Sequence, residues 1–191
     1  MLEPTNLAEL ADGALSQLRA ALRGADGAPL ERDAALAVLR RHLGRVQLLM
    51  RDGFEQSRIQ GLEAAGASSR LTDTLVVALH EHALAVVSGQ VGRLCLVGTG
   101  GYGRGVLAPF SDVDLLFLTP GDASKDAQAA VEFMLYILWD LGLKVGHATR
   151  SIEDCLREAR GDVTVWTSLL DARHIAGDGQ VFEAFRAACA E

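Results

Sequence analysis

Apolar residues recur at three- and four-residue spacing along the first half of the chain, the spacing of amphipathic helices. The pattern covers residues 6–23, 30–61 and 69–88, and it predicts two or three helices. Residues 24–29 and 61–69 contain glycine together with proline or serine, and we expect them to separate these helices.

Three strands are predicted beyond this helical part. We expect Ser69 to cap the third helix, which is strongly apolar on one side and should pack on the sheet. Residues 94–97 form a short apolar run, residues 112–118 are apolar on both faces after an acidic start, and residues 144–149 form the third strand. A strand that is apolar on both faces is typical of a central, covered position in a sheet.

Helices are predicted between and after the strands. Residues 124–141 place apolar side chains on one side, which indicates a sheet-covering helix ended by Gly142. Ser151 and Asp154 resemble a capping box, with aspartate in place of the usual glutamate, and we expect a helix from there through Arg160.

The complete pattern predicts an α+β fold with α/β-like character. Two further helical patterns cover residues 162–175 and 181–190. We expect a small mixed sheet of three or more strands that is covered by helices, with an N-terminal helical segment and C-terminal helices. The predicted organisation is a helical region over 1–90 that packs on the sheet, a core over 91–178, and the start of a truncated C-terminal helix over 179–191.

Composition favours a cytosolic enzyme domain. The chain has 191 residues, of which 49% are hydrophobic, and a net charge of −7. This length suffices for one well-cored domain, or for one domain plus a helical lobe. No apolar run approaches the length of a membrane span. The first ten residues, MLEPTNLAEL, carry acids where a signal peptide needs basic residues. We therefore expect a cytoplasmic protein without a membrane partner.

Charge and cysteine content exclude two further classes. A protein that grips nucleic acid carries a basic stripe, and this acidic chain has none, so a protein acceptor fits better than RNA or DNA. Cys95, Cys155 and Cys189 are widely spaced and odd in number, which indicates neither a disulfide framework nor a zinc site. We interpret them as small buried hydrophobic residues.

The strongest candidate chemistry lies in residues 94–118, LCLVGTGGYGRGVLAPFSDVDLLFL. Asp112 and Asp114 are two residues apart, so on an extended strand their carboxylates point the same way. Two like charges held that close raise each other's pKa and cost stability unless a divalent cation neutralises them. The pair therefore predicts a magnesium site.

The glycine-rich turn before these acids predicts phosphate binding. Four glycines between positions 100 and 105 leave backbone N–H groups uncovered and tolerate positive φ. The pattern GGYGRG matches neither the P-loop nor the Rossmann fingerprint. Phosphate and magnesium at one place indicate phosphoryl or nucleotidyl transfer. The predicted phosphate-binding residues are Gly100, Gly101, Gly103, Arg104 and Ser111, the last being also a candidate turn cap.

Several other polar and aromatic residues leave alternatives open. We expect His80 and His82 on a helix surface, and Trp139 and Trp166 in the core. His147 is either a site residue or a half-buried histidine of the third strand.

The arginines and the tyrosine near the site are equally ambiguous. Tyr102 stacks on a base or shields the glycine turn. Arg150 and Arg173 contact phosphate or pair with Asp154 and Asp171, respectively.

The residues from Gly100 onward resemble a known superfamily. Gly-Gly followed by SDVD at the start of an apolar strand resembles the DNA polymerase beta nucleotidyltransferases. Three longer strings resemble the N-terminal domain of the bifunctional uridylyltransferase/uridylyl-removing enzymes that modify the nitrogen regulatory protein PII. They are GGYGRGVLAPFSDVDLLFL, LWDLGLKVGHATRSIEDC and TSLLDARHIAGD, and the resemblance covers about residues 94–178.

This resemblance implies a magnesium-dependent transfer of UMP from UTP to a tyrosine hydroxyl of PII, with release of pyrophosphate. It implies that Asp112 and Asp114 are catalytic metal ligands. It also implies a third metal-site carboxylate on the third strand, but the strand sequence KVGHATR contains no acid. Asp171, Asp162 and a water molecule remain the alternatives for this third ligand.

The removing activity of that family lies in a His-Asp hydrolase domain. The chain has no His-Asp doublet, so we expect transferase chemistry without removal. The alternatives are another superfamily nucleotidyltransferase with a different nucleotide or acceptor, and a catalytically idle nucleotide-binding regulatory module.

Overall fold

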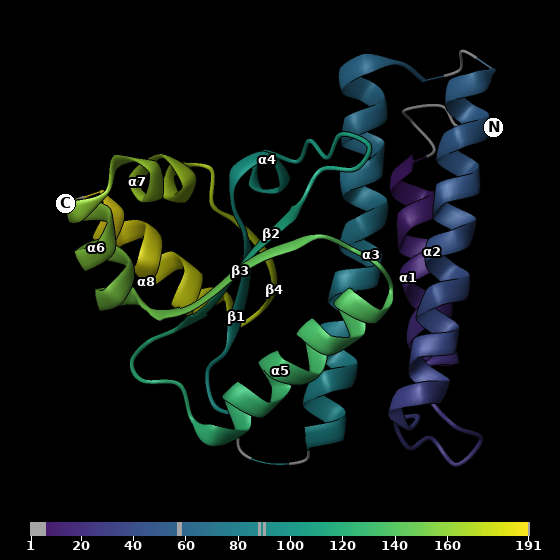
Figure 1. Cartoon of the computed structure of the whole chain (residues 1–191). Helices are drawn as coiled ribbons and strands as arrows, with labels where there is room; N and C mark the ends of the chain where they lie inside the picture. Colours follow the sequence, from purple (N-terminus) through teal and green to yellow (C-terminus); the bar gives the residue numbers. More distant parts are fainter. Residues whose placement is uncertain (1–6, 57–58, 88, 90, 191) are drawn as a thin grey trace.

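The computed structural model describes residues 7–56, 59–87, 89 and 91–190. These residues form eight helices and four strands, which confirms the predicted α+β class (Figure 1). The ends of the predicted helices at residues 6 and 88 lie outside the described part. The elements are α1 (Leu7–Ala21), α2 (Arg32–Glu55), α3 (Gly61–Val87), β1 (Cys95–Gly98), α4 (Gly100–Gly103), β2 (Val113–Thr119), α5 (Lys125–Asp140), β3 (Val145–Ser151), α6 (Ile152–Gly161), α7 (Val163–Leu170), β4 (Arg173–Gly177) and α8 (Gly179–Cys189).

The four strands form one mixed sheet with the order β3-β2-β1-β4. β2 pairs parallel with β3, while β1 pairs antiparallel with both β2 and β4. The register places Asp114 opposite Gly146, and Leu118 opposite Arg150. Because side chains alternate along a strand, these two pairs lie on the same face of the sheet.

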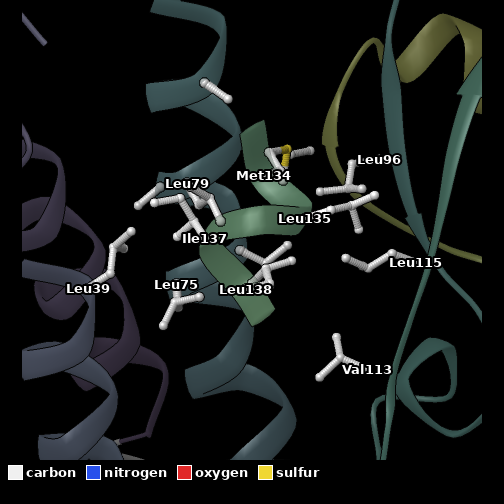
Figure 2. Close-up of a cluster of buried hydrophobic side chains, with 14 of the residues drawn as sticks. Leu39, Leu75, Leu79, Leu96, Val113, Leu115, Met134, Leu135, Ile137 and Leu138 are labelled. Atoms are coloured by element: carbon white, nitrogen blue, oxygen red, sulfur yellow. The ribbon is translucent and has the colours of Figure 1, made fainter. Parts of the chain in front are cut away.

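Helices cover both faces of the sheet (Figure 1). One face packs on α3 and α5, with α1 and α2 behind them, and the other packs on α6 and α8. Figure 2 shows α5 between two layers: Leu135 lies on the side of Leu96 and Leu115 of the sheet, and Ile137 on the side of Leu39 of α2. The central position predicted for β2 is confirmed, since six of its seven residues are buried.

The predicted break at residues 61–69 is wrong, because α3 runs without interruption from Gly61. Ser69 is buried inside this helix instead of capping it. The small residues allow close packing: the backbone oxygen of Gly105 would lie 3.9 Å from a Cβ at Gly66. The N–H of Leu107 donates to the Ala65 carbonyl at 3.0 Å. The small residues therefore mark a close approach between a helix and a loop.

The single helix predicted over 162–175 is also wrong, since α7 ends at Leu170 and β4 follows. The strand exists because it pairs with β1, a contact that local periodicity does not reveal. The predicted capping box is confirmed, with the Asp154 N–H donating to Ser151 Oγ at 3.1 Å. Gly142 follows α5 with φ of 77°, as its predicted role requires.

The histidine and tryptophan expectations need correction. His80 and His82 are buried instead of exposed, because α3 is packed on both sides by other elements. Trp139 is 45% exposed and therefore not a core residue.

The predicted burial of Cys95 and Cys155 is confirmed, and burial raises the pKa of each thiol to about 12. No helix in the described ranges combines the length and the apolar character that a bilayer crossing requires.

Candidate functional site

The two predicted acids lie at the start of β2. Asp114 is the second residue of the strand and is partly buried, while Asp112 precedes the strand and is exposed. Burial raises the pKa of Asp114, and the negative charge of Asp112 raises it further. Neither carboxylate takes part in an ion pair within the described ranges. The site therefore holds two neighbouring acids without a basic partner.

Two glycines enclose the Asp114 side chain. A Cβ at Gly100 would lie 3.1 Å from Asp114 Oδ2, and a Cβ at Gly146 would overlap Oδ1. The Thr99 N–H donates to the Asp114 backbone carbonyl at 3.1 Å. Sequence reasoning missed Gly146, although a glycine inside a strand is a signal of close approach by another group.

The glycine segment is a short helical turn, α4, where the sequence suggested a loop. Gly100 begins the turn with φ of 56°, a backbone conformation that glycine adopts without strain. A Cβ at Gly103 would overlap the Asp171 carbonyl and lie 2.8 Å from the Gly98 carbonyl. Gly103 is therefore required by close packing between α4, β1 and the segment before β4.

A buried polar cluster anchors this turn to α3. Tyr102 is fully buried, and its hydroxyl donates to Asp73 Oδ1 at 2.6 Å. Burial raises the pKa of Tyr102 well above its ordinary value, and the Asp73 carboxylate acts in the same direction. The open choice for Tyr102 is thus resolved against stacking on a base, because its ring lies in the core.

Arg173 of β4 completes the cluster. Its guanidinium donates to both carboxylate oxygens of Asp73, at 2.8 and 3.1 Å, and lies 5.3 Å from the centre of the Tyr102 ring. It also donates to the carbonyls of Tyr102 at 3.1 Å and Gly103 at 3.2 Å. Arg173 therefore holds the end of α4, and it does not pair with Asp171.

The candidates for a third acid are engaged elsewhere. Asp171 pairs with Arg104, and Asp162 caps α7 by accepting from the Thr164 N–H at 2.7 Å. His147 lies on the opposite face of the sheet from Asp114, with its ring 5.7 Å from the ring of Trp139. Within the described ranges, no group of three or more His, Cys, Asp or Glu residues is placed to hold a metal ion.

The remaining predicted phosphate contacts are distributed around the turn. Gly100 lies beside Asp114, whereas Gly103 and Arg104 contact Asp171. Gly101 is partly exposed, and the N–H of the exposed Ser111 donates to the Ala108 carbonyl at 3.1 Å. Phosphate binding by these residues stays a prediction.

A cavity of about 150 Å³ opens beside Asp114. The residue after β1, the first half of β2, β3 from Gly146 to Arg150 and the last turn of α7 line it. Two unpaired carboxylates offer hard oxygen ligands, and Mg²⁺ is usually held by one or two such groups plus substrate phosphates. The donor set thus fits Mg²⁺. Lining residues include Thr99, Asp114, Gly146, Arg150, Ser168 and Leu169.

Comparison with known proteins identifies similar chains. Residues 87–167 match the nucleotidyltransferase domain family. The chain is similar to the "bifunctional uridylyltransferase/uridylyl-removing enzyme" of Gluconobacter oxydans, with 51% identity over 77% of the chain and 16% of that protein. Proteins of the same name from Phenylobacterium zucineum and Caulobacter vibrioides are 43% and 40% identical over 97% and 95% of the chain. The chain spans 21% and 20% of those two, or about a fifth of the length of the curated relatives that it matches.

Asp114→Asn should stabilise the protein at neutral pH. The raised pKa means that the folded state holds this proton more tightly than the unfolded state, so stability falls as pH rises through this range. We expect a higher melting temperature than wild type at pH 7.5, because the uncharged amide removes the cost of holding a charged carboxylate in this partly buried position. The gain should vanish below about pH 4, where both states are protonated. Exposed Asp52→Asn is the control, and a lower melting temperature for Asp114→Asn at pH 7.5 would contradict the expectation.

Gly146→Ala should disturb the acid pair. The added methyl overlaps the Asp114 carboxylate, so a side chain or a strand must shift, at a cost of about 1–3 kcal/mol. Urea unfolding measures this loss. Gly44→Ala is the matched control, because nothing lies within 4 Å of its Cβ in the middle of α2, and there we expect a gain of up to about 1 kcal/mol. Equal stability of Gly146→Ala and wild type would refute the close contact.

Arg173→Met should destabilise the chain by about 2 kcal/mol or more, because it removes the cationic partner of Asp73 and one hydrogen bond to each of the Tyr102 and Gly103 carbonyls. Denaturant unfolding provides the measurement. Arg70→Met, an exposed change on the same helix as Asp73, should stay within about 0.5 kcal/mol of wild type. A similarly small effect at Arg173 would show that the cluster does not hold the turn.

Proposed function

Residues 87–167 of this chain are a nucleotidyltransferase domain, and on this premise we propose that the chain transfers UMP from UTP to a tyrosine hydroxyl of PII, with release of pyrophosphate. One observation carries the proposal: two neighbouring, unpaired carboxylates, Asp112 and Asp114, lie beside a glycine turn at the start of a central strand. The relatives' name supports the uridylyl group. The acceptor rests on the resemblance of the three sequence strings to the enzymes that modify PII.

Asp112 and Asp114 would hold Mg²⁺. They are close enough for the charge of Asp112 to raise the pKa of Asp114, and that repulsion is relieved when a divalent cation is shared. Bound there, the ion would neutralise the two carboxylates and polarise phosphate oxygens of the donor.

The chain's own residues contribute positioning. Asp114 is held between the backbones of Gly100 and Gly146, and the Thr99 N–H fixes its carbonyl. Arg173 fixes the end of the turn that carries Gly100. Nucleotidyl transfer depends mainly on positioning and electrostatic stabilisation, so these contacts act on the rate by holding the acids and the turn in one geometry.

Gly100, Gly101 and Gly103, with Arg104 and Ser111, are the proposed triphosphate contacts. The proposal assigns transfer to this chain and assigns uridylyl removal to none of its residues. A catalytically idle nucleotide-binding module is the second candidate, and the observation that favours it is the convergence of only two acids within the described ranges.

Asp112→Asn and Asp114→Asn should each lower transfer by about a thousandfold or more, because each removes a charge that would bind the metal. The chain is incubated with Mg²⁺, α-labelled UTP and purified PII, and label on PII is counted. Parallel reactions with ATP, CTP and GTP test the base, and Asp52→Asn is the control for an unrelated exposed aspartate.

Three results would oppose the proposal in different ways. Undiminished labelling by both aspartate variants would refute the assigned acids. Label from another nucleotide would refute UTP as the donor. UTP binding without any transfer by the wild-type chain would favour the idle module.

A further inference from the structure

Arg150 shares a cavity with Asp114. It lies on β3 opposite Leu118, on the same face of the sheet as Asp114. Both residues line the cavity of about 150 Å³, together with Ser168 and Leu169 of α7. Between Gly146, which pairs with Asp114, and Arg150, β3 has one residue on this face, Ala148, so the strand places no acid there.

The guanidinium of Arg150 has no anionic partner within the described ranges. Asp154, the partner that the sequence offered, accepts hydrogen bonds from Ser151 and pairs with Arg157. The backbone carbonyl of Arg150 accepts from the Thr119 hydroxyl at 3.4 Å, and the residue pairs with Leu118 in the sheet. A half-buried cation without a partner is costly in a protein, and an anionic ligand relieves that cost.

The negative charge of the site favours a positively charged side chain without an ion-pair partner. A single divalent ion balances Asp112 and Asp114, and a bound triphosphate brings further negative charge. Arg104 already pairs with Asp171, so its charge is partly compensated. Arg150 supplies a positive charge that is not compensated in this way, at the wall of the cavity that Asp114 also lines.

The size and lining of the cavities decide which group binds. Arg150 also borders a larger cavity of about 470 Å³, but Asp122, Glu132 and Asp154 line that one, and their charges disfavour an anion. The smaller cavity is below the roughly 300–1,000 Å³ of pockets that enclose a whole drug-sized ligand. It therefore suits phosphate groups better than a complete nucleotide.

We propose that Arg150 binds phosphate oxygens of the donor nucleotide in the cavity that it shares with Asp114. This inference rests on the proposed nucleotidyl transfer. Arginine suits the task because its planar guanidinium can donate two parallel hydrogen bonds to one phosphate group. In this assignment Arg150 is a substrate-binding residue.

Equilibrium binding to the 191-residue chain in Mg²⁺ tests the proposal. Affinities for UTP and for uridine are measured by calorimetry or ligand-observed NMR for wild type, Arg150→Met, Arg150→Lys and the control Arg41→Met. Arg41 is exposed on α2. We expect Arg150→Met to weaken UTP about tenfold or more and to leave uridine unchanged, because only UTP carries the phosphate. Arg150→Lys should lie between, since it keeps the charge and loses the forked geometry.

The outcomes separate this inference from the function on which it rests. UTP affinity that is unchanged in Arg150→Met overturns the Arg150 assignment, and labelling of PII by the same variant would leave the proposed transfer standing. Equal weakening of UTP and uridine also overturns it, because that points to a deformed cavity. Weaker PII binding with unchanged UTP affinity overturns it in favour of an acceptor contact.

Two further results complete the test. A wild-type chain that binds no UTP and labels no PII refutes the proposed function and the Arg150 assignment together. If melting curves show that Arg150→Met does not fold, Arg150→Lys carries the comparison, and UTP affinity equal to wild type then overturns the assignment of forked phosphate binding.

Discussion

The guanidinium of Arg173 connects three segments that are far apart in the sequence. It donates to Asp73 of α3 and to two carbonyls at the end of α4. Arg173 itself belongs to β4, which pairs with β1. The position of α4 sets the position of Gly100, and Gly100 is one wall around the Asp114 carboxylate. The geometry of the acid pair therefore depends on an ion pair that lies behind the turn and has no need to touch a substrate.

Much of the fold could be predicted because its signals are local. The apolar spacing of α5, the capping box at Ser151 and the two-sided apolar pattern of β2 are each contained within a few residues. The errors have non-local causes. β4 exists through pairing with β1, and the small residues at the start of α3 serve contact with the segment around Leu107. A single segment, read alone, does not carry the information for either contact.

The candidate site divides in the same way. Asp112 and Asp114 are predictable from the sequence because their spacing and residue type are unusual for a strand. The sequence offers Arg150 as a phosphate contact, but it does not place Arg150 or Gly146 beside Asp114. Their positions there follow from the parallel register between β2 and β3. Arg104 was predicted at the turn, but its ion pair with Asp171 depends on how the segment before β4 packs. The residues with candidate chemistry can thus be predicted from the sequence, whereas the ion-pair partner of each charge can be identified only from the fold.

His80 gives the junction between α3 and β4 a sensitivity to acid. His80 lies in α3, and His174 follows Arg173 directly in β4; each has a buried Nε2 without a hydrogen-bond partner in the described residues. Burial lowers the pKa of His80, with a further contribution from His174. A lowered pKa means that the unfolded chain takes up the proton more readily, so acidification below about pH 6.5 withdraws stability from this junction. Protonation of His80 would thereby weaken the packing that holds α4 in place, without any protonation of Asp112 or Asp114.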